Sequence, residues 1–111
     1  MKLTTETFGN VMVAHTPDDM TEETSSEFLD ALERSIDEGH IHIIAQMDRT
    51  DAYDSAGLAA LLDLQDQLRE RGGNLKICGL ADPGRKIFEI TRLDRRFDLF
   101  ESVIDAVASF Q

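Results

Sequence analysis

The sequence predicts a single-domain α/β fold: a mixed, mostly parallel β-sheet with about four helices packed mainly on one side. Apolar runs with the spacing of strands alternate along the chain with runs that have the spacing of helices, which is typical of a largely parallel sheet. The two-residue turn Gly9-Asn10 separates the first two strand-like runs, so the sheet should begin with an antiparallel hairpin. A chain of 111 residues, 41% of them hydrophobic, is long enough to bury one core. We therefore expect one domain over residues 1–111.

The front part of the chain predicts the hairpin, one helix and a buried strand. Residues 3–8 and 11–16 have the composition of strands. Thr24 to Glu27 has the spacing of a capping box, which predicts a helix from there to about Glu38, ended by Gly39. The residues that this helix should bury are Phe28, Leu29, Leu32 and Ile36. Residues 40–47 are mostly apolar on both faces, as expected of an interior strand.

The middle of the chain predicts a second helix that begins at a serine. Asp54 and Ser55 are residue types that start helices well, because their side-chain oxygens accept hydrogen bonds from first-turn amides. An apolar stripe follows at helical spacing: Leu58, Leu61, Leu64 and Leu68. Gly72-Gly73 should end the helix. This arrangement would hold the Ser55 hydroxyl on a rigid, exposed corner, where it could be modified.

The last third predicts two strands and two helices. Residues 75–80 form a short buried strand, and Asp82 should cap a helix with Pro83 in its first turn, anchored by Ile87, Phe88 and Ile90. Residues 97–100 have the pattern of a short edge strand. Ser102 and Asp105 should open a final helix that turns four apolar residues inward: Val103, Ala106, Val107 and Phe110.

The charge of the chain limits its partners. The formal net charge is −11, which argues against nucleic acid or an anionic membrane as the main partner. Residues 1–51 hold 12 acidic and 3 basic side chains, whereas residues 52–111 hold 10 and 8. The acidic first half is either a docking face for a basic partner or a solubilising surface.

The cysteine count and the distribution of apolar residues indicate the cellular location. Cys78 is the single cysteine, so an internal disulfide is excluded. The first residues lack the apolar core of a signal peptide, and no run approaches the roughly 20 apolar residues of a membrane span. We expect a cytoplasmic protein.

The element order and the serine motif together resemble the STAS family, the domain of anti-sigma-factor antagonists and of sulfate-transporter tails. The resemblance covers nearly all of the chain, and three features carry it: residues 54–58 (Asp-Ser-Ala-Gly-Leu), residues 72–75 leading into a strand that ends at Gly79-Leu80, and the spacing of Phe88, Leu93, Phe97 and Phe100. The family's usual motif has a serine or threonine before the glycine and Leu-Gly after it, so Ala56 and Ala59 are departures. Ala56 removes a hydroxyl that could bond a phosphate or a kinase.

The resemblance implies a function as a non-enzymatic binding module without cofactor or metal. In such antagonists the unphosphorylated protein binds an anti-sigma factor that is also an ATP-dependent serine kinase. Phosphorylation of the motif serine, Ser55 here, ends the binding, and a serine phosphatase restores it. The resemblance places the partner surface at Asp54, Ser55, Ala56 and Gly57, where Gly57 would let a partner backbone approach closely. A family aspartate after the second strand matches Asp19 best, with Asp18 as the alternative.

Two other functions are compatible with parts of the sequence. A STAS subunit of a lipid-transport ABC complex or of a sensory assembly would use the same helix without modification of Ser55. In a receiver-type phosphoacceptor, the pair Asp18-Asp19 would instead hold Mg²⁺ beside Asp48, which would accept the phosphate. A receiver needs a lysine after its last strand, however, and no lysine follows Lys86.

Three weaker patterns could indicate a metal site, a calcium loop or a hydrolase triad, but each lacks a required part. His40 and His42 could share a strand face as metal ligands, but no third ligand is evident, so we expect strand-edge histidines. Asp48, Asp51 and Asp54 do not match a calcium loop and are interpreted as turn formers. A triad of Ser55, His15 and an aspartate lacks the Gly-x-Ser-x-Gly elbow of a hydrolase.

Overall fold

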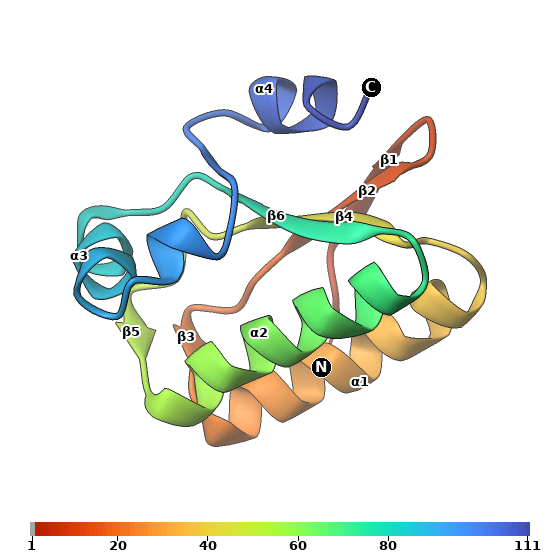
Figure 1. Ribbon diagram of the computed structural model, residues 1–111. Coiled ribbons are helices and arrows are strands. Elements are labelled where there is room, and N and C mark those ends of the chain that lie inside the picture. Colours follow the sequence, from red (N-terminus) through yellow and green to blue (C-terminus); the bar gives the residue numbers. More distant parts are fainter. Residues whose placement is uncertain (1) are drawn as a thin grey trace.

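The computed structural model describes residues 2–111 and has the predicted α/β architecture (Figure 1). Two strands, β1 (Thr5–Phe8) and β2 (Val11–His15), form a hairpin around Gly9, whose φ of +63° suits the turn. The remaining elements are β3 (Asp19–Met20), α1 (Glu22–Asp37), β4 (His42–Gln46), β5 (Ala52–Tyr53), α2 (Ser55–Glu70), β6 (Asn74–Cys78), α3 (Asp82–Ile90), the 3₁₀-helix η1 (Leu93–Arg95), β7 (Leu99–Phe100) and α4 (Val103–Ala108).

Within residues 2–111, the main sheet has five strands in the order β1-β2-β4-β6-β7. β1 is antiparallel to β2, and every other neighbouring pair is parallel. The register places Val13 beside Ile44 and Ile43 beside Leu75. Since α1 connects the β2 side to β4 and α2 connects the β4 side to β6, the two helices run parallel to each other. A separate two-stranded pair joins β3 and β5.

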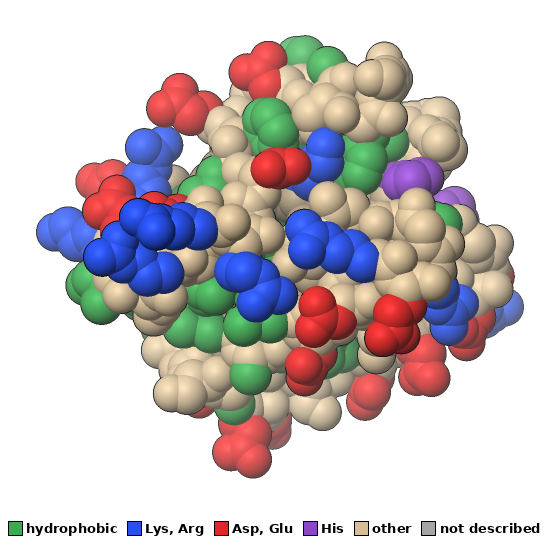
Figure 2. Space-filling view, in the orientation of Figure 1, with side chains coloured by type: hydrophobic (Ala, Val, Ile, Leu, Met, Phe, Trp, Pro, Cys, Tyr) green, Lys and Arg blue, Asp and Glu red, His purple; other side chains and the backbone are tan. Residues whose placement is uncertain are grey.

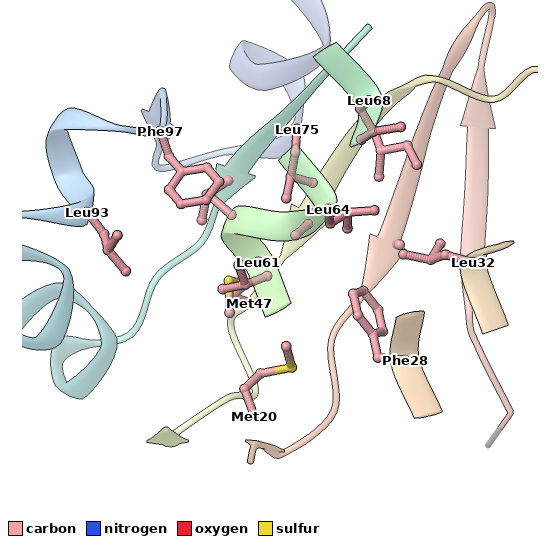
Figure 3. Close-up of a cluster of buried hydrophobic side chains, with 14 of the residues drawn as sticks. Met20, Phe28, Leu32, Met47, Leu61, Leu64, Leu68, Leu75, Leu93 and Phe97 are labelled. Carbon is pink, nitrogen blue, oxygen red and sulfur yellow. The ribbon is translucent and has the colours of Figure 1, made fainter. Parts of the chain in front are cut away.

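Each face of the sheet has its own apolar cluster. Helices α1 and α2, with α3 beside them, cover one face, and α4 lies over the other (Figure 1). Figure 3 shows side chains from α1, α2 and β6 interlocking on the first face, with Met20 and Met47 filling the space at the lower end. The leucine stripe of α2 lies where it was predicted: Leu61, Leu64 and Leu68 are buried and Leu58 packs partly buried against them. Burial of these side chains holds the start of α2 in a fixed position.

A buried lysine fastens α4 to the second face. Lys76 lies on β6, is 9% exposed, and its Nζ donates to the carbonyl oxygen and to the hydroxyl of Ser109, at 3.2 Å and 2.9 Å. The ammonium also lies 4.3 Å from the centre of the Phe110 ring. Ser109 is the C-cap of α4, so a cation is placed where the helix leaves unpaired carbonyls. As predicted, Ser102 caps the other end of α4 by accepting from the Asp105 amide.

The structure corrects three details of the sequence analysis. Helix α1 begins at Glu22, because Thr21 is its N-cap and forms the capping box with Thr24; the predicted box at Thr24 to Glu27 lies inside the helix. Helix α3 has Ala81 as its N-cap, so Asp82 lies one residue inside and does not cap it. Phe88 is fully buried, but Ile90 at the end of α3 is 80% exposed and anchors nothing in the core.

Candidate functional site

The short strands β3 and β5 bring the start of α1 next to the start of α2. Their register pairs Asp19 with Ala52 and Met20 with Tyr53. The Asp54 amide donates to the Met20 carbonyl at 3.1 Å, which extends the pairing by one bond. Asp19, half-buried, therefore lies on the strand that flanks the Asp54-Ser55 corner. Asp18, which is exposed, precedes that strand, and its carbonyl accepts from the Asp51 amide.

One carboxylate caps both helices at this corner. Asp54 is the N-cap of α2, and its Oδ1 accepts from the Gly57 amide at 2.8 Å. Its Oδ2 accepts from the amide of Glu22, the first residue of α1, at 3.1 Å. A cap normally satisfies amides of its own helix, so this second bond joins two helices through one side chain. The positive ends of two helix dipoles meet around the Asp54 side chain.

Gly57 is required by the protein's own backbone. It is buried, and a Cβ built on it would lie 1.8 Å from the Met20 carbonyl oxygen. We expected the glycine to admit a partner's backbone; the backbone that approaches it is strand β3 of the same chain. Gly57 therefore allows strand β3 to pack against the start of α2. A glycine in a sequence can indicate that another backbone approaches closely, but it does not indicate whether that backbone belongs to a partner or to the same chain.

Ser55 is the first residue of α2 and is exposed. Ala56 beside it is half-buried. The Ser55 hydroxyl thus lies at the surface, at the N-terminal end of a helix whose apolar stripe is packed into the core. This position is the one predicted from the cap pattern.

Buried threonines join the two loops that lead to the corner. The Thr16 hydroxyl lies 2.7 Å from that of Thr50, which in turn donates to the carbonyl of Pro17. Thr50 is completely buried and Thr16 is 3% exposed. Buried hydrogen bonds therefore join the loop after β2 to the loop after β4. Sequence patterns do not reveal this contact, because Thr16 and Thr50 lie far apart in the chain.

Tyr53 connects the corner to α3. Its ring packs edge-on against Phe88, with centres 6.4 Å apart, and its hydroxyl lies over Gly84, where a Cβ would be 2.7 Å away. Burial, and secondly the charge of Asp51, raise the pKa of Tyr53 to about 12. The phenol therefore stays protonated to well above physiological pH.

The weaker candidate patterns are not assembled into sites. His15 contacts Glu6, with Nε2 2.6 Å from Oε1. His40 lies in the loop before β4, and His42 packs edge-on against Phe110, with centres 5.3 Å apart. Among residues 2–111, no three His, Cys, Asp or Glu side chains are close enough together to hold a metal ion. No helix in that range has the length and apolar character to cross a bilayer.

Comparison with known proteins identifies the family to which this architecture belongs. The sequence model of the STAS domain matches residues 2–106. The chain belongs to the STAS family. The mixed sheet and the four helices that residues 2–111 form are those of a STAS domain, as the resemblance implied.

Proteins similar to this STAS domain include several named as anti-sigma factor antagonists and also members of transporter families. BtrV of Bordetella bronchiseptica, provisionally named an anti-sigma factor antagonist, is 28% identical over 111 residues, covering 100% of this chain and 96% of BtrV. A crystal structure of a protein with the same provisional name from Thermotoga maritima has a TM-score of 0.88 at 15% identity, with 96% and 92% of the two chains covered. The phosphorylated form of the Bacillus cell fate determinant SpoIIAA has a TM-score of 0.75 at 16% identity, with 99% and 100% covered.

Proposed function

We propose that this STAS domain is an anti-sigma factor antagonist whose binding is switched by phosphorylation of Ser55. The observation that supports it most directly is the exposed Ser55 hydroxyl at the first position of α2. The names of the relatives support the same role. The unphosphorylated domain would bind an anti-sigma factor that is also a serine kinase. Since sigma factors act on RNA polymerase, the domain would work in the cytoplasm.

The proposed switch is a phosphoryl transfer followed by hydrolysis. The partner kinase transfers the γ-phosphoryl group of ATP to Ser55 Oγ, which loses its proton, and ADP is released. A serine phosphatase then adds water to the phosphoserine and releases inorganic phosphate. A structure of the similarly folded SpoIIAA exists in a phosphorylated form, which supports the proposal that this fold can accommodate a phosphate. The domain itself catalyses neither step in this proposal.

Electrostatics favours a switch that changes binding and leaves the fold intact. A phosphate adds roughly −1.5 to −2 charges, and the N-terminus of α2 would stabilise it by about 0.3–1 kcal/mol. A partner carboxylate about 5 Å away would repel each added charge by about 3 kcal/mol at an effective dielectric constant near 20, before screening by salt. The Asp54 carboxylate accepts hydrogen bonds from two helix amides, so it is fixed beside Ser55. Its negative charge would repel a phosphate on Ser55. The partner complex is therefore the state that phosphorylation weakens.

The proposed docking surface consists of Asp19, Asp54, Ser55 and Ala56, with Gly57 beneath it. Asp54 and Ser55 are exposed, whereas Asp19 and Ala56 are half-buried. A partner that covers this corner would bury the Ser55 hydroxyl, so an added phosphate would also exclude it by size.

A kinase assay tests the acceptor. The domain is incubated with the anti-sigma factor kinase of the same genome and ATP, and the tryptic peptide of residues 50–69 is analysed by mass spectrometry. We expect one added phosphate on Ser55 and none in Ser55→Ala. Thr50 in the same peptide is fully buried and serves as an internal negative control. A phosphate on Thr50 or Tyr53, or none on the peptide, would contradict the proposal.

A binding assay tests the switch. We expect Ser55→Asp to weaken binding of the unmodified partner by about tenfold, equivalent to about 1.4 kcal/mol. The far-ultraviolet circular dichroism and the melting temperature of the domain should stay close to those of the wild type, because Ser55 is exposed. Ser55→Ala should bind like the wild type or nearly so. If Ser55→Asp binds unchanged, the charge at this position does not control the complex.

A further inference from the structure

The end of the molecule opposite Ser55 carries a groove between α1 and α2. Its volume is about 480 Å³, and it lies along the C-terminal halves of the two helices. Leu29 and Leu64 form its apolar floor, and Asp30, Glu33 and Glu70 stand on its rims. Leu64 is almost fully buried, whereas Leu29 is half-buried, so Leu29 is the main apolar surface that an occupant would meet. The groove begins about 14 Å along α2 from Ser55, which is too far to share its contacts.

The rims of the groove are negative and largely unpaired. In residues 2–111, Asp30, Glu33 and Glu70 take part in no ion pair, while Arg71 pairs with Asp37 at 3.2 Å at the end of the groove. Clefts lined by one sign of charge concentrate the field of that charge. Figure 2 shows several acidic side chains over the lower right of the molecule, where α1 and α2 lie, with basic ones beside them at the right edge, and a cluster of basic side chains on the left near α3. The groove is therefore a concave negative surface.

The helix dipoles add to this polarity because α1 and α2 are parallel. The bond from the Glu22 amide to Asp54 joins their N-terminal ends, and the pair formed by Asp37 and Arg71 joins their C-terminal ends. Both negative dipole ends consequently lie at the groove, and both positive ends lie at Ser55. The same pair of helices favours an anion at one end and cations at the other.

We propose that this groove binds a helical segment of a partner protein that is rich in lysine or arginine. Asp30 and Glu33 are one turn apart on α1, and Glu70, the last residue of α2, lines the same groove closer to the C-terminal ends of the helices. A helix laid along the groove presents side chains three or four residues apart on one face, which matches this spacing of carboxylates. A leucine-sized residue on the same face would cover Leu29. Charge complementarity selects the basic helix over an acidic or neutral one.

A peptide titration tests the proposal. The probe is a 14-residue amphipathic helix of lysine and leucine, added to the ¹⁵N-labelled full chain at an ionic strength near 0.15 M; its twin with glutamate for lysine is the negative control. We expect the largest changes in amide chemical shift in residues 29–37 and 64–71. Changes spread over all acidic surfaces, changes centred on another element, or no changes would each overturn the proposal.

Two double variants separate a specific site from general attraction to a protein of charge −11. Asp30→Lys with Glu33→Lys should weaken peptide binding by about tenfold. Glu89→Lys with Asp94→Lys makes the same change in net charge away from the groove and should weaken it by less than about threefold, the part due to net charge alone. Equal weakening by both pairs would overturn the proposal. Ser55→Asp should leave peptide binding unchanged, so this test and the test of the Ser55 switch can fail separately.

Discussion

The two carboxylate oxygens of Asp54 accept hydrogen bonds from two different helices. Replacing Asp54 by alanine removes both bonds, from the Gly57 and Glu22 amides. We expect Asp54→Ala to lower the free energy of unfolding by about 1–2 kcal/mol. Urea denaturation followed by circular dichroism measures this loss.

Asparagine is the matched control for that change. Asp54→Asn keeps one acceptor oxygen, so it retains one of the two caps and should lose a smaller part of the stability. The structure predicts the order wild type, then Asn, then Ala. If the alanine and asparagine variants are equally stable, the second bond, to the Glu22 amide, contributes nothing.

Gly57→Ala should destabilise the protein although alanine is the better helix former. At an exposed helical position this substitution stabilises by about 0.5–1 kcal/mol. Here the new Cβ would lie 1.8 Å from the Met20 carbonyl oxygen, so strand β3 must move. Overpacking of this kind costs about 1–3 kcal/mol. Thermal denaturation gives the sign of the change, and a melting temperature above that of the wild type would show that β3 yields without cost.

At the scale of elements, α4 is short and depends on the lysine beneath it. Lys76→Met keeps most of the apolar stem but removes both hydrogen bonds to Ser109 and the contact with the Phe110 ring. We expect faster amide hydrogen exchange in residues 103–110 and a loss of about 1–3 kcal/mol. Lys86→Met, at an exposed position on α3, is the control and should change neither quantity. Unchanged exchange in α4 of the Lys76 variant would mean that apolar contacts alone hold the helix.

Long elements were predictable because their patterns are local. The stripe from Leu58 to Leu68, the apolar run of β4 and the hairpin turn at Gly9 each follow from a few neighbouring residues. Strands β3 and β5 have two residues each and no pattern of their own. They exist because Met20 and Tyr53 meet in the folded chain, which sequence spacing does not reveal.

The corner around Ser55 was predictable in part for the same reason. An aspartate and a serine before an apolar helical stripe indicate a cap, and the cap is formed by Asp54. Its second bond, to the Glu22 amide, joins residues 32 positions apart. The predicted start of α1 is too late because residues 24–27 have the spacing of a capping box but lie inside the helix. The real box begins at Thr21, whose amide donates to the Thr24 hydroxyl where a glutamate would usually accept.

Across the whole molecule, the pair of parallel helices separates two kinds of surface. The Ser55 end has two helix N-termini joined by one carboxylate. The other end has two helix C-termini and a groove lined by Asp30, Glu33 and Glu70, which form no ion pair within residues 2–111. An added phosphate and a basic segment would therefore act on opposite ends of one rigid unit. In our proposals, phosphorylation at the Ser55 end regulates one complex, and the groove at the other end binds a basic helical segment of a partner protein.

The stability of the whole domain should fall at alkaline pH because two buried groups, the Cys78 thiol and the Tyr53 phenol, hold their protons more tightly in the folded state. Burial, with a smaller effect of Asp48, raises the pKa of Cys78 from 9.0 to about 11, and burial raises that of Tyr53 from 10.0 to about 12. The unfolded chain loses these protons at lower pH than the folded chain does, so the folded state binds more protons in that range. The free energy of unfolding must then decrease as pH rises, from about pH 9 for Cys78 and from about pH 10 for Tyr53.

Urea denaturation at several values between about pH 8 and about pH 11 measures this slope, and two variants assign it. Tyr53→Phe keeps the ring that packs against Phe88 and removes the phenolic proton, so the decrease above about pH 10 should become smaller. Cys78→Ala opens a small cavity and lowers stability at every pH, but the decrease that begins near pH 9 should become smaller because no thiol remains to ionise. The slope of each variant, and not its absolute stability, is the quantity to compare. If both variants keep the slope of the wild type, repulsion within an already acidic chain, and not these two buried groups, causes the alkaline loss.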